Sequence, residues 1–200
     1  MRAAFQRTTG NKVADIPVTE LEPLPVKGVN SDGSPAPSGS SADPSYASGY
    51  GFDIAASPAT TNGAYAAGDV MGGFLEFTVA NLNDAPVLIT GIQVTFKAAV
   101  QPNLRAIFLS AAPSALLADN DPYTLTATNA LLVRKSLSSV ALGASYTSHG
   151  TPKSISLAPN PFVMKPYSGG KKIGVYIIDD SGVTLTSTSD MQVRVSGLGA

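Results

Sequence analysis

The sequence predicts an all-β protein in which a long extended N-terminal arm precedes a single β-sandwich. Only 14% of the 200 residues are charged, against about 25% in an average globular protein, and small residues common in strands and turns take their place. Residues 1–62 lack the apolar content of a folded domain. Short segments of alternating hydrophobicity, separated by turn residues, fill residues 63–200.

Residues 1–62 are expected to form the arm. From Gly28 to Thr61 the sequence is dominated by Pro, Gly, Ser and Ala, and large aliphatic side chains are nearly absent. Such a segment cannot bury enough apolar area to offset the entropy lost on ordering. The arm is therefore expected to be extended and mobile in the free protein.

Two similar short stretches interrupt the arm, Ile16-Pro17-Val18-Thr19 and Leu24-Pro25-Val26-Lys27. Each proline favours an extended backbone, with an apolar side chain on either side of it. The stretches are either parts of a polyproline-like linker or anchors that lie across a neighbouring protein surface. Nearby aromatic residues favour anchoring, because they gain little unless they are buried. The residues expected to contact a partner are Ile16, Val18, Leu24, Val26, Tyr46, Tyr50 and Phe52.

Strand signals recur at short intervals beyond Tyr65. The clearest spans residues 87–97, where apolar and polar residues alternate as in a half-buried strand. Residues 173–178 are continuously apolar, and residues 113–118 are expected to form one helical turn. Further strands are expected in residues 74–79, 104–110, 131–142, 155–157 and 191–195. The pattern predicts a sandwich of jelly-roll or immunoglobulin-like topology, and the cysteine pair and tryptophan of antibody-type domains are absent.

Residues suited to catalysis or metal binding are few and scattered. His149 is the only histidine and lies in a segment of loop composition, and the chain has no cysteine. The acidic residues at 119–121 and 179–180 fit either calcium binding or turns. Turns are favoured, because neither segment matches the twelve-residue calcium loop. We therefore expect no enzymatic activity, no cofactor and no metal.

Net charge and hydropathy also limit the classes of partner that the sequence allows. The formal net charge is −1 and no long basic run is present, so nucleic acid is not expected as a partner. No apolar run approaches the roughly 20 residues that span a membrane. No signal peptide is visible at Met1, so the protein is expected to be made in the cytoplasm and to stay soluble until it assembles.

The segment Tyr65-Ala66-Ala67-Gly68-Asp69-Val70-Met71-Gly72-Gly73-Phe74 resembles a group of small structural proteins from virions of tailed bacteriophages. Similar stretches occur at residues 107–113 with 118–122, at 173–178 and at 185–195. The resemblance covers residues 65 to about 196 and rests on structural motifs. It implies a virion component, either a capsid decoration (cement) protein or a head or tail appendage, and it brings no catalytic residues.

We therefore expect a decoration protein, made in the host cytoplasm, that binds the outer head surface and stabilises the shell. The major capsid protein would be its partner, and a homotrimer would match three-fold sites on the shell. The arm would spread contacts over several subunits and become ordered only on assembly. The alternative is a head-fibre, neck or tail appendage with an adhesive sandwich.

Overall fold

The computed structural model describes residues 4–9, 12–17, 50–79, 85–157 and 160–199, and the chain divides into two units, residues 1–46 and 47–200. In the first unit, β1 (Ala4–Thr9) and β2 (Lys12–Pro17) form an antiparallel hairpin. Phe5 is paired with Ile16. The beginning of the expected arm therefore has an extended backbone, but part of it is paired.

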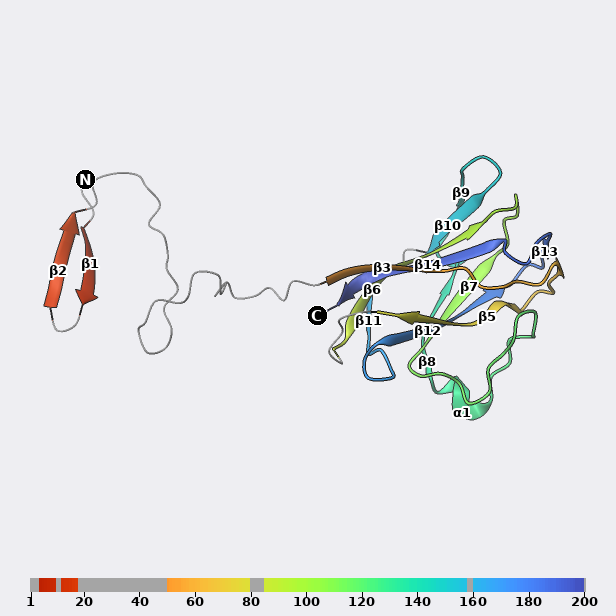
Figure 1. Ribbon diagram of the computed structural model, residues 1–200, viewed down its shortest axis with the longest axis horizontal. Helices are drawn as coiled ribbons and strands as arrows, with labels where there is room; N and C mark the ends of the chain where they lie inside the picture. Colours follow the sequence, from red (N-terminus) through yellow and green to blue (C-terminus); the bar gives the residue numbers. More distant parts are fainter. Residues whose placement is uncertain (1–3, 10–11, 18–49, 80–84, 158–159, 200) are drawn as a thin grey trace. The chain divides into compact units, whose positions relative to one another are not determined.

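The second unit is a sandwich of two antiparallel sheets (Figure 1). The six-stranded sheet has the order β3-β14-β6-β10-β9, and β11 also pairs with β6. Its strands are β3 (Tyr50–Ala56), β6 (Val87–Phe96), β9 (Tyr146–Ser148), β10 (Lys153–Leu157), β11 (Phe162–Met164) and β14 (Met191–Gly199). The four-stranded sheet has the order β5-β12-β7-β8. Its strands are β5 (Asp69–Thr78), β7 (Leu104–Leu109), β8 (Val133–Ser138) and β12 (Lys172–Asp179). Two short strands, β4 (Gly63–Ala64) and β13 (Thr184–Leu185), pair separately.

The order of strand pairing identifies the topology as a jelly roll. The pairs are nested along the chain: β3 pairs with β14, β5 with β12, β6 with β10, and β7 with β8. This is the pattern of one long hairpin rolled up so that its strand pairs fall alternately in the two sheets. Eight strands arranged in two such sheets define the jelly roll. The sequence left jelly-roll and immunoglobulin-like topologies open, and the pairing decides between them.

The main core lies between the two sheets. In β6 the residues Val87, Ile89, Ile92, Val94 and Phe96 are at most 1% exposed, which confirms the alternation expected for this strand. β14 alternates in the same way, with Val193 and Val195 fully buried. β12 is instead buried from Ile173 to Asp179. Both faces of the four-stranded sheet are therefore covered.

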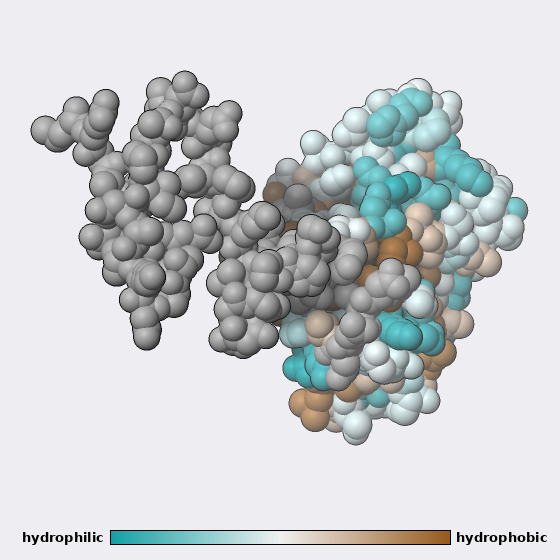
Figure 2. All heavy atoms as spheres, turned by 60° about the vertical axis from the view of Figure 1, so that its left-hand side comes forward, coloured by the Kyte–Doolittle hydropathy of each residue, from teal (hydrophilic) through white to brown (hydrophobic). Residues whose placement is uncertain are grey.

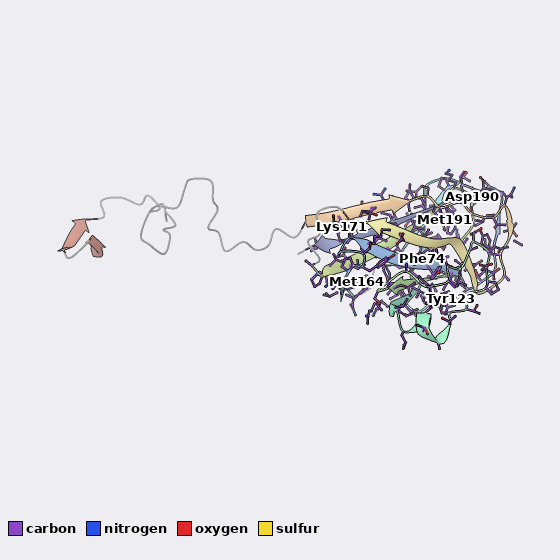
Figure 3. The ribbon with its side chains drawn as sticks, turned by 60° about the horizontal axis from the view of Figure 1, so that its bottom comes forward. Phe74, Tyr123, Met164, Lys171, Asp190 and Met191 are labelled. Atoms are coloured by element: carbon purple, nitrogen blue, oxygen red, sulfur yellow. The ribbon has the colours of Figure 1, made fainter. Side chains whose placement is uncertain are left out.

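A second, smaller core covers the outer face of the four-stranded sheet. Tyr176 and Ile178 of β12 are fully buried there, beneath side chains from the segment 110–132. Phe74 and Tyr123, labelled in Figure 3, place their rings 5.1 and 5.8 Å from that of Tyr176. The Leu117 amide donates a hydrogen bond of 3.1 Å to the Tyr176 hydroxyl. We call this outer surface the covered face.

The segment 110–132 contains the single described helix, α1 (Ala127–Ala130), which lies below the four-stranded sheet in Figure 1. Thr126 caps it by accepting a hydrogen bond from the Asn129 amide. The helical turn expected at residues 113–118 is wrong, because that stretch forms bends that carry Leu117 onto the sheet. No helix among the described residues is long and apolar enough to cross a membrane.

The domain begins earlier in the chain than the sequence suggested. Residues 50–56 were assigned to the arm, but they form β3 and pair with β14 from Tyr50 to Ala56. Phe52 packs against the main core, and a Cβ at Gly197 would lie 2.5 Å from its ring. The arm therefore ends before residue 50, and Phe52 is part of the sandwich.

Gly72 and Gly73 form a bulge in β5. Both have positive φ angles, 76° and 69°, and the pairing with β12 shifts register between Val175 and Ile177. A side chain at Gly72 would lie 2.6 Å from Pro58, so glycine is required there. The bulge bends β5 at the point where residues 58 and 119 approach it.

Candidate functional site: the open face of the six-stranded sheet

The outer surface of the six-stranded sheet has no covering segment among the described residues, and we call it the open face. Strand register places Ser156 of β10, Gln93 of β6 and Arg194 of β14 in one row across the sheet. Gln93 Nε2 donates to Ser156 Oγ at 3.4 Å, and Arg194 forms an ion pair of 2.6 Å with Asp53. The open face is therefore polar but nearly neutral.

A shallow depression of about 330 Å³ lies in the middle of the open face. Its cause is local, because the pairing of β14 with β6 shifts between Ser196 and Gly197 and leaves Thr90 without a partner in β14. Beside it, Gly91 carries no side chain to fill the space. The depression is lined by Asp53, Thr90, Gly91, Ile92, Gln93, Ser156, Leu157, Arg194 and Ser196. Carboxylate, guanidinium, amide and hydroxyl groups thus surround one hollow.

One end of the open face is apolar. Leu88 of β6 is paired with Leu198 of β14 on one side and with Val163 of β11 on the other. Leu198 is 44% exposed and Val163 is 67% exposed. In the view of Figure 2, hydrophobic residues form separate patches among hydrophilic ones. The open face therefore combines a small apolar strip with a polar hollow, a composition similar to that of transient protein interfaces.

The groups considered for catalysis take part in local hydrogen bonds. His149 Nε2 lies 2.8 Å from Ser154 Oγ, whereas the neighbouring Ser148 Oγ accepts a bond of 2.6 Å from Lys153. The structure therefore pairs His149 with Ser154 and not with Ser148. Among the described residues, no third side chain forms a hydrogen bond that orients the His149 imidazole, as a nucleophile–base pair requires.

The acidic segments considered for calcium bind backbone and hydroxyl groups instead. Asp119 accepts hydrogen bonds from the Thr61 amide at 2.5 Å, the Thr61 hydroxyl at 2.6 Å and the Tyr65 hydroxyl at 2.9 Å, and another from the Gly72 amide. Burial, aided by the Asp119 carboxylate, raises the pKa of Tyr65. Asp179 accepts from the amide and hydroxyl of Ser181. Both segments fit turn chemistry, and the described residues contain no group of three or more His, Cys, Asp or Glu suited to a metal.

The residues expected to contact a partner lie only partly among the described residues. Val18, Leu24, Val26 and Tyr46 lie outside them. Ile16 lies in β2, Tyr50 begins β3, and Phe52 packs into the sandwich. A contact site made of these residues therefore stays a prediction.

The open-face residues were missed as a site, although the sequence did indicate their orientation. The alternation in residues 87–97 and 191–196 placed Gln93, Arg194 and Ser196 on outward faces. Their adjacency depends on β14 lying between β3 and β6. That strand order brings Asp53 next to a residue 141 positions away in sequence, and no local pattern encodes it.

No known family model matches the chain. No curated protein matches it either. Among solved structures, the chain is similar to one in the native virion of Kashmir bee virus at acidic pH, with 10% identity and a TM-score of 0.25. That alignment covers 98% of this chain and 89% of the other. A TM-score of this size carries no argument about function, and the jelly-roll assignment rests on the strand pairing alone.

Proposed function

We propose that this protein is a structural component of a bacteriophage virion that decorates the outer surface of the head and binds the major capsid protein. The observation that carries the proposal is the difference between the two outer faces of the sandwich. Segment 110–132 covers one face, and no other described segment covers the second face. The arm also joins the domain through β3, which belongs to the sheet with the open face.

The chemistry of the open face suits attachment to another protein. Close contact with a charged surface requires charges to lose water, which is costly unless each is paired. On the open face Arg194 and Asp53 already pair with each other. Small polar side chains elsewhere allow close approach, and Leu198 and Val163 supply exposed apolar area for burial.

The arm and the shell's symmetry would strengthen this attachment. Ordering an extended segment costs free energy at the moment of binding, but the segment spreads its contacts over a wide surface. Many copies on a symmetric shell turn weak contacts into firm attachment. The resemblance of residues 65–196 to tailed-phage virion proteins supports the same role. Because jelly rolls serve many functions, the fold alone does not select it.

The test is binding of the purified full chain to heads that lack it, measured by co-sedimentation. Replacing Leu198 and Val163 by Asp places two charges on the apolar strip, and we expect affinity to fall at least about 10-fold, or about 1.4 kcal/mol. The matched control replaces Leu131 by Asp. Leu131 is 79% exposed on the opposite side of the sandwich, so binding should not change. Equal binding by all three proteins would reject the open face as the contact.

The contribution of the arm is tested by deleting residues 1–46. This deletion leaves β3 and the whole second unit intact, whereas removing residues 1–60 would delete an edge strand of the sandwich. We expect the shortened protein to fold and to bind heads at least about 10-fold more weakly, because the arm's contacts are lost. Undiminished binding would show that the sandwich attaches alone.

The depression favours a second candidate, an appendage at the neck or tail that adheres to a glycan. Its volume of about 330 Å³ and its hydrogen-bonding side chains fit one sugar ring. Immunogold labelling of purified particles separates the two functions. Label spread over heads supports decoration, and label confined to the neck or tail, with glycan binding by the full chain, supports the appendage.

A further inference from the structure

The free edges of the two sheets differ in how they are protected against pairing with other strands. An unprotected edge presents unpaired N–H and C=O groups, and proteins block such edges by covering, bulges, charges or short length. The edge of β5 is covered by the chain itself. Val70 donates to Asp121 O and accepts from the Asn120 amide, both at 2.8 Å, and the Tyr123 amide donates to Gly68 O at 2.9 Å.

The other protected edges use charge, irregularity or short length. β8 carries the exposed Arg134 and the half-buried Lys135, and its pairing with β7 shifts register between Phe108 and Leu109. β9 and β11 contain three residues each. None of these strands offers a long, regular edge.

β3 has none of these protections. It is seven residues long, and its register with β14 runs from Tyr50 to Ala56 without a shift. Its one charged residue, Asp53, is already paired with Arg194 at 2.6 Å. Among the described residues, no strand pairs with the other side of β3.

The core is also incomplete at this edge. Phe52, Ile54 and Ala56 point towards the main core but are only partly buried, whereas Val193 and Val195 of the adjacent β14 are fully buried. The partly exposed side chains form an apolar margin along β3. A further strand with apolar residues at alternating positions would cover them and gain the free energy of their burial.

We propose that the β3 edge pairs with β3 of a second copy of this chain, forming a two-fold dimer with one continuous sheet. The segment preceding β3 does not supply a matching strand, because residues 28–49 contain Val29 and Tyr46 as their only large apolar residues. β3 itself matches. An antiparallel register centred on Asp53 places Phe52 opposite Ile54 of the second copy, both on the core side.

Symmetry favours the second copy as the occupant. Strand register places Ser196 opposite Asp53 within one copy, and Arg194 forms its ion pair with Asp53 from a diagonal position. The two Asp53 carboxylates would face each other across the new pair, and each keeps its own guanidinium, which offsets the repulsion between them. A two-fold interface uses the same patch on both copies and closes after one association. The joined sheet then ends on both sides at the short β9, which prevents growth into fibres.

This inference does not rest on the proposed function, and the mass of the full chain in solution tests it. Light scattering coupled to size exclusion should give twice the chain mass of 20.4 kDa. Ala55 is exposed on β3, and Ala55→Asp places a carboxylate on each copy diagonally across from Asp53 of the other. We expect the added repulsion to weaken the dimer at least about 10-fold. The control, Ser136→Asp, adds the same charge at an exposed position of β8 and should leave the dimer unchanged.

Each alternative result overturns the proposal. A wild-type monomer at high concentration would show that the β3 edge stays free. A trimer would support the three-fold association expected from the sequence instead of a two-fold pair. A dimer that tolerates Ala55→Asp, or one that Ser136→Asp disrupts equally, would place the interface elsewhere. Thermal unfolding of both variants verifies that each remains folded.

Discussion

The two sheets of the sandwich share one core but differ in what their outer surfaces do. Outward side chains on the covered face are large and apolar, such as Tyr176 and Ile178, and the segment 110–132 packs over them. Outward side chains on the open face are polar or small, such as Gln93 and Ser196. The outward-facing residues of each strand therefore differ between the two sheets: apolar ones are buried beneath segment 110–132, and polar ones leave the open face without a covering segment among the described residues.

The largest expected effect is a difference in the free energy of unfolding between substitutions on the two faces. Tyr176→Ala removes a fully buried ring that contacts Phe74 and Tyr123, and we expect it to lower the free energy of unfolding by about 3–5 kcal/mol. Gln192→Ala, at an exposed position of β14, should change it by less than about 0.5 kcal/mol. Urea denaturation measures both. Equal losses would mean that the segment 110–132 does not stabilise the covered face.

A smaller effect compares one aspartate on each side. Asp119→Ala leaves the Gly72 amide and the Thr61 and Tyr65 hydroxyls without this acceptor, which should cost about 3 kcal/mol. Asp53→Ala removes an ion pair whose side chains are 43% and 52% exposed, so its cost should stay below about 1 kcal/mol. The measurement is again the urea midpoint. A greater loss of stability for Asp53→Ala would contradict the inference that Asp119 stabilises the domain by linking residues 58–65 to β5.

The smallest effect concerns Glu76, which lies on the outer side of β5 but is exposed. A hydrogen bond from Tyr167, opposed by partial burial and supported by Lys172, lowers the pKa of Glu76. A lowered pKa stabilises the folded state above the unfolded value of about 4.3, and this contribution is lost as the pH falls through the folded pKa. Because the Glu76 side chain is 35% exposed, solvent screening should keep the contribution to a few tenths of a kcal/mol.

Glu76→Gln tests this expectation. The variant should be slightly less stable than the wild type at pH 7, and the difference should shrink as the pH falls through the folded pKa of Glu76. Urea midpoints at low salt, measured over a series of pH values, follow the difference. A difference that grows in acid would show that the hydrogen bond from Tyr167 does not favour the charged form.

Much of the fold could be predicted because its strands carry strong local signals. The continuous apolar run Ile173–Ile178 and the alternation in β6 and β14 indicated both the strands and their burial. β3 was missed because Gly51, Ala55 and Ala56 resemble the small residues of the preceding segment, and only Phe52 and Ile54 mark the core side. Its strand character comes from pairing with β14, which is distant in sequence.

The open face could be predicted only in part, for a related reason. Side-chain orientation depends on the local pattern, so the alternation of apolar and polar residues indicated the outward positions of Gln93 and Arg194. Adjacency is not local, because it depends on the jelly-roll strand order that brings β3, β14 and β6 together. The depression depends on a register shift at Thr90, and the alternation around that residue does not reveal it.

The nested pairing has a consequence for how the domain forms during synthesis. β14 is the last strand of the domain to leave the ribosome, and it inserts between β3 and β6, which are made much earlier. Such long-range closure is slow, because distant parts of the chain must meet before their contacts stabilise them. Arg194, Ser196 and Leu198 all belong to β14. A nascent chain therefore lacks the complete open face until β14 has been made and has paired with β3 and β6.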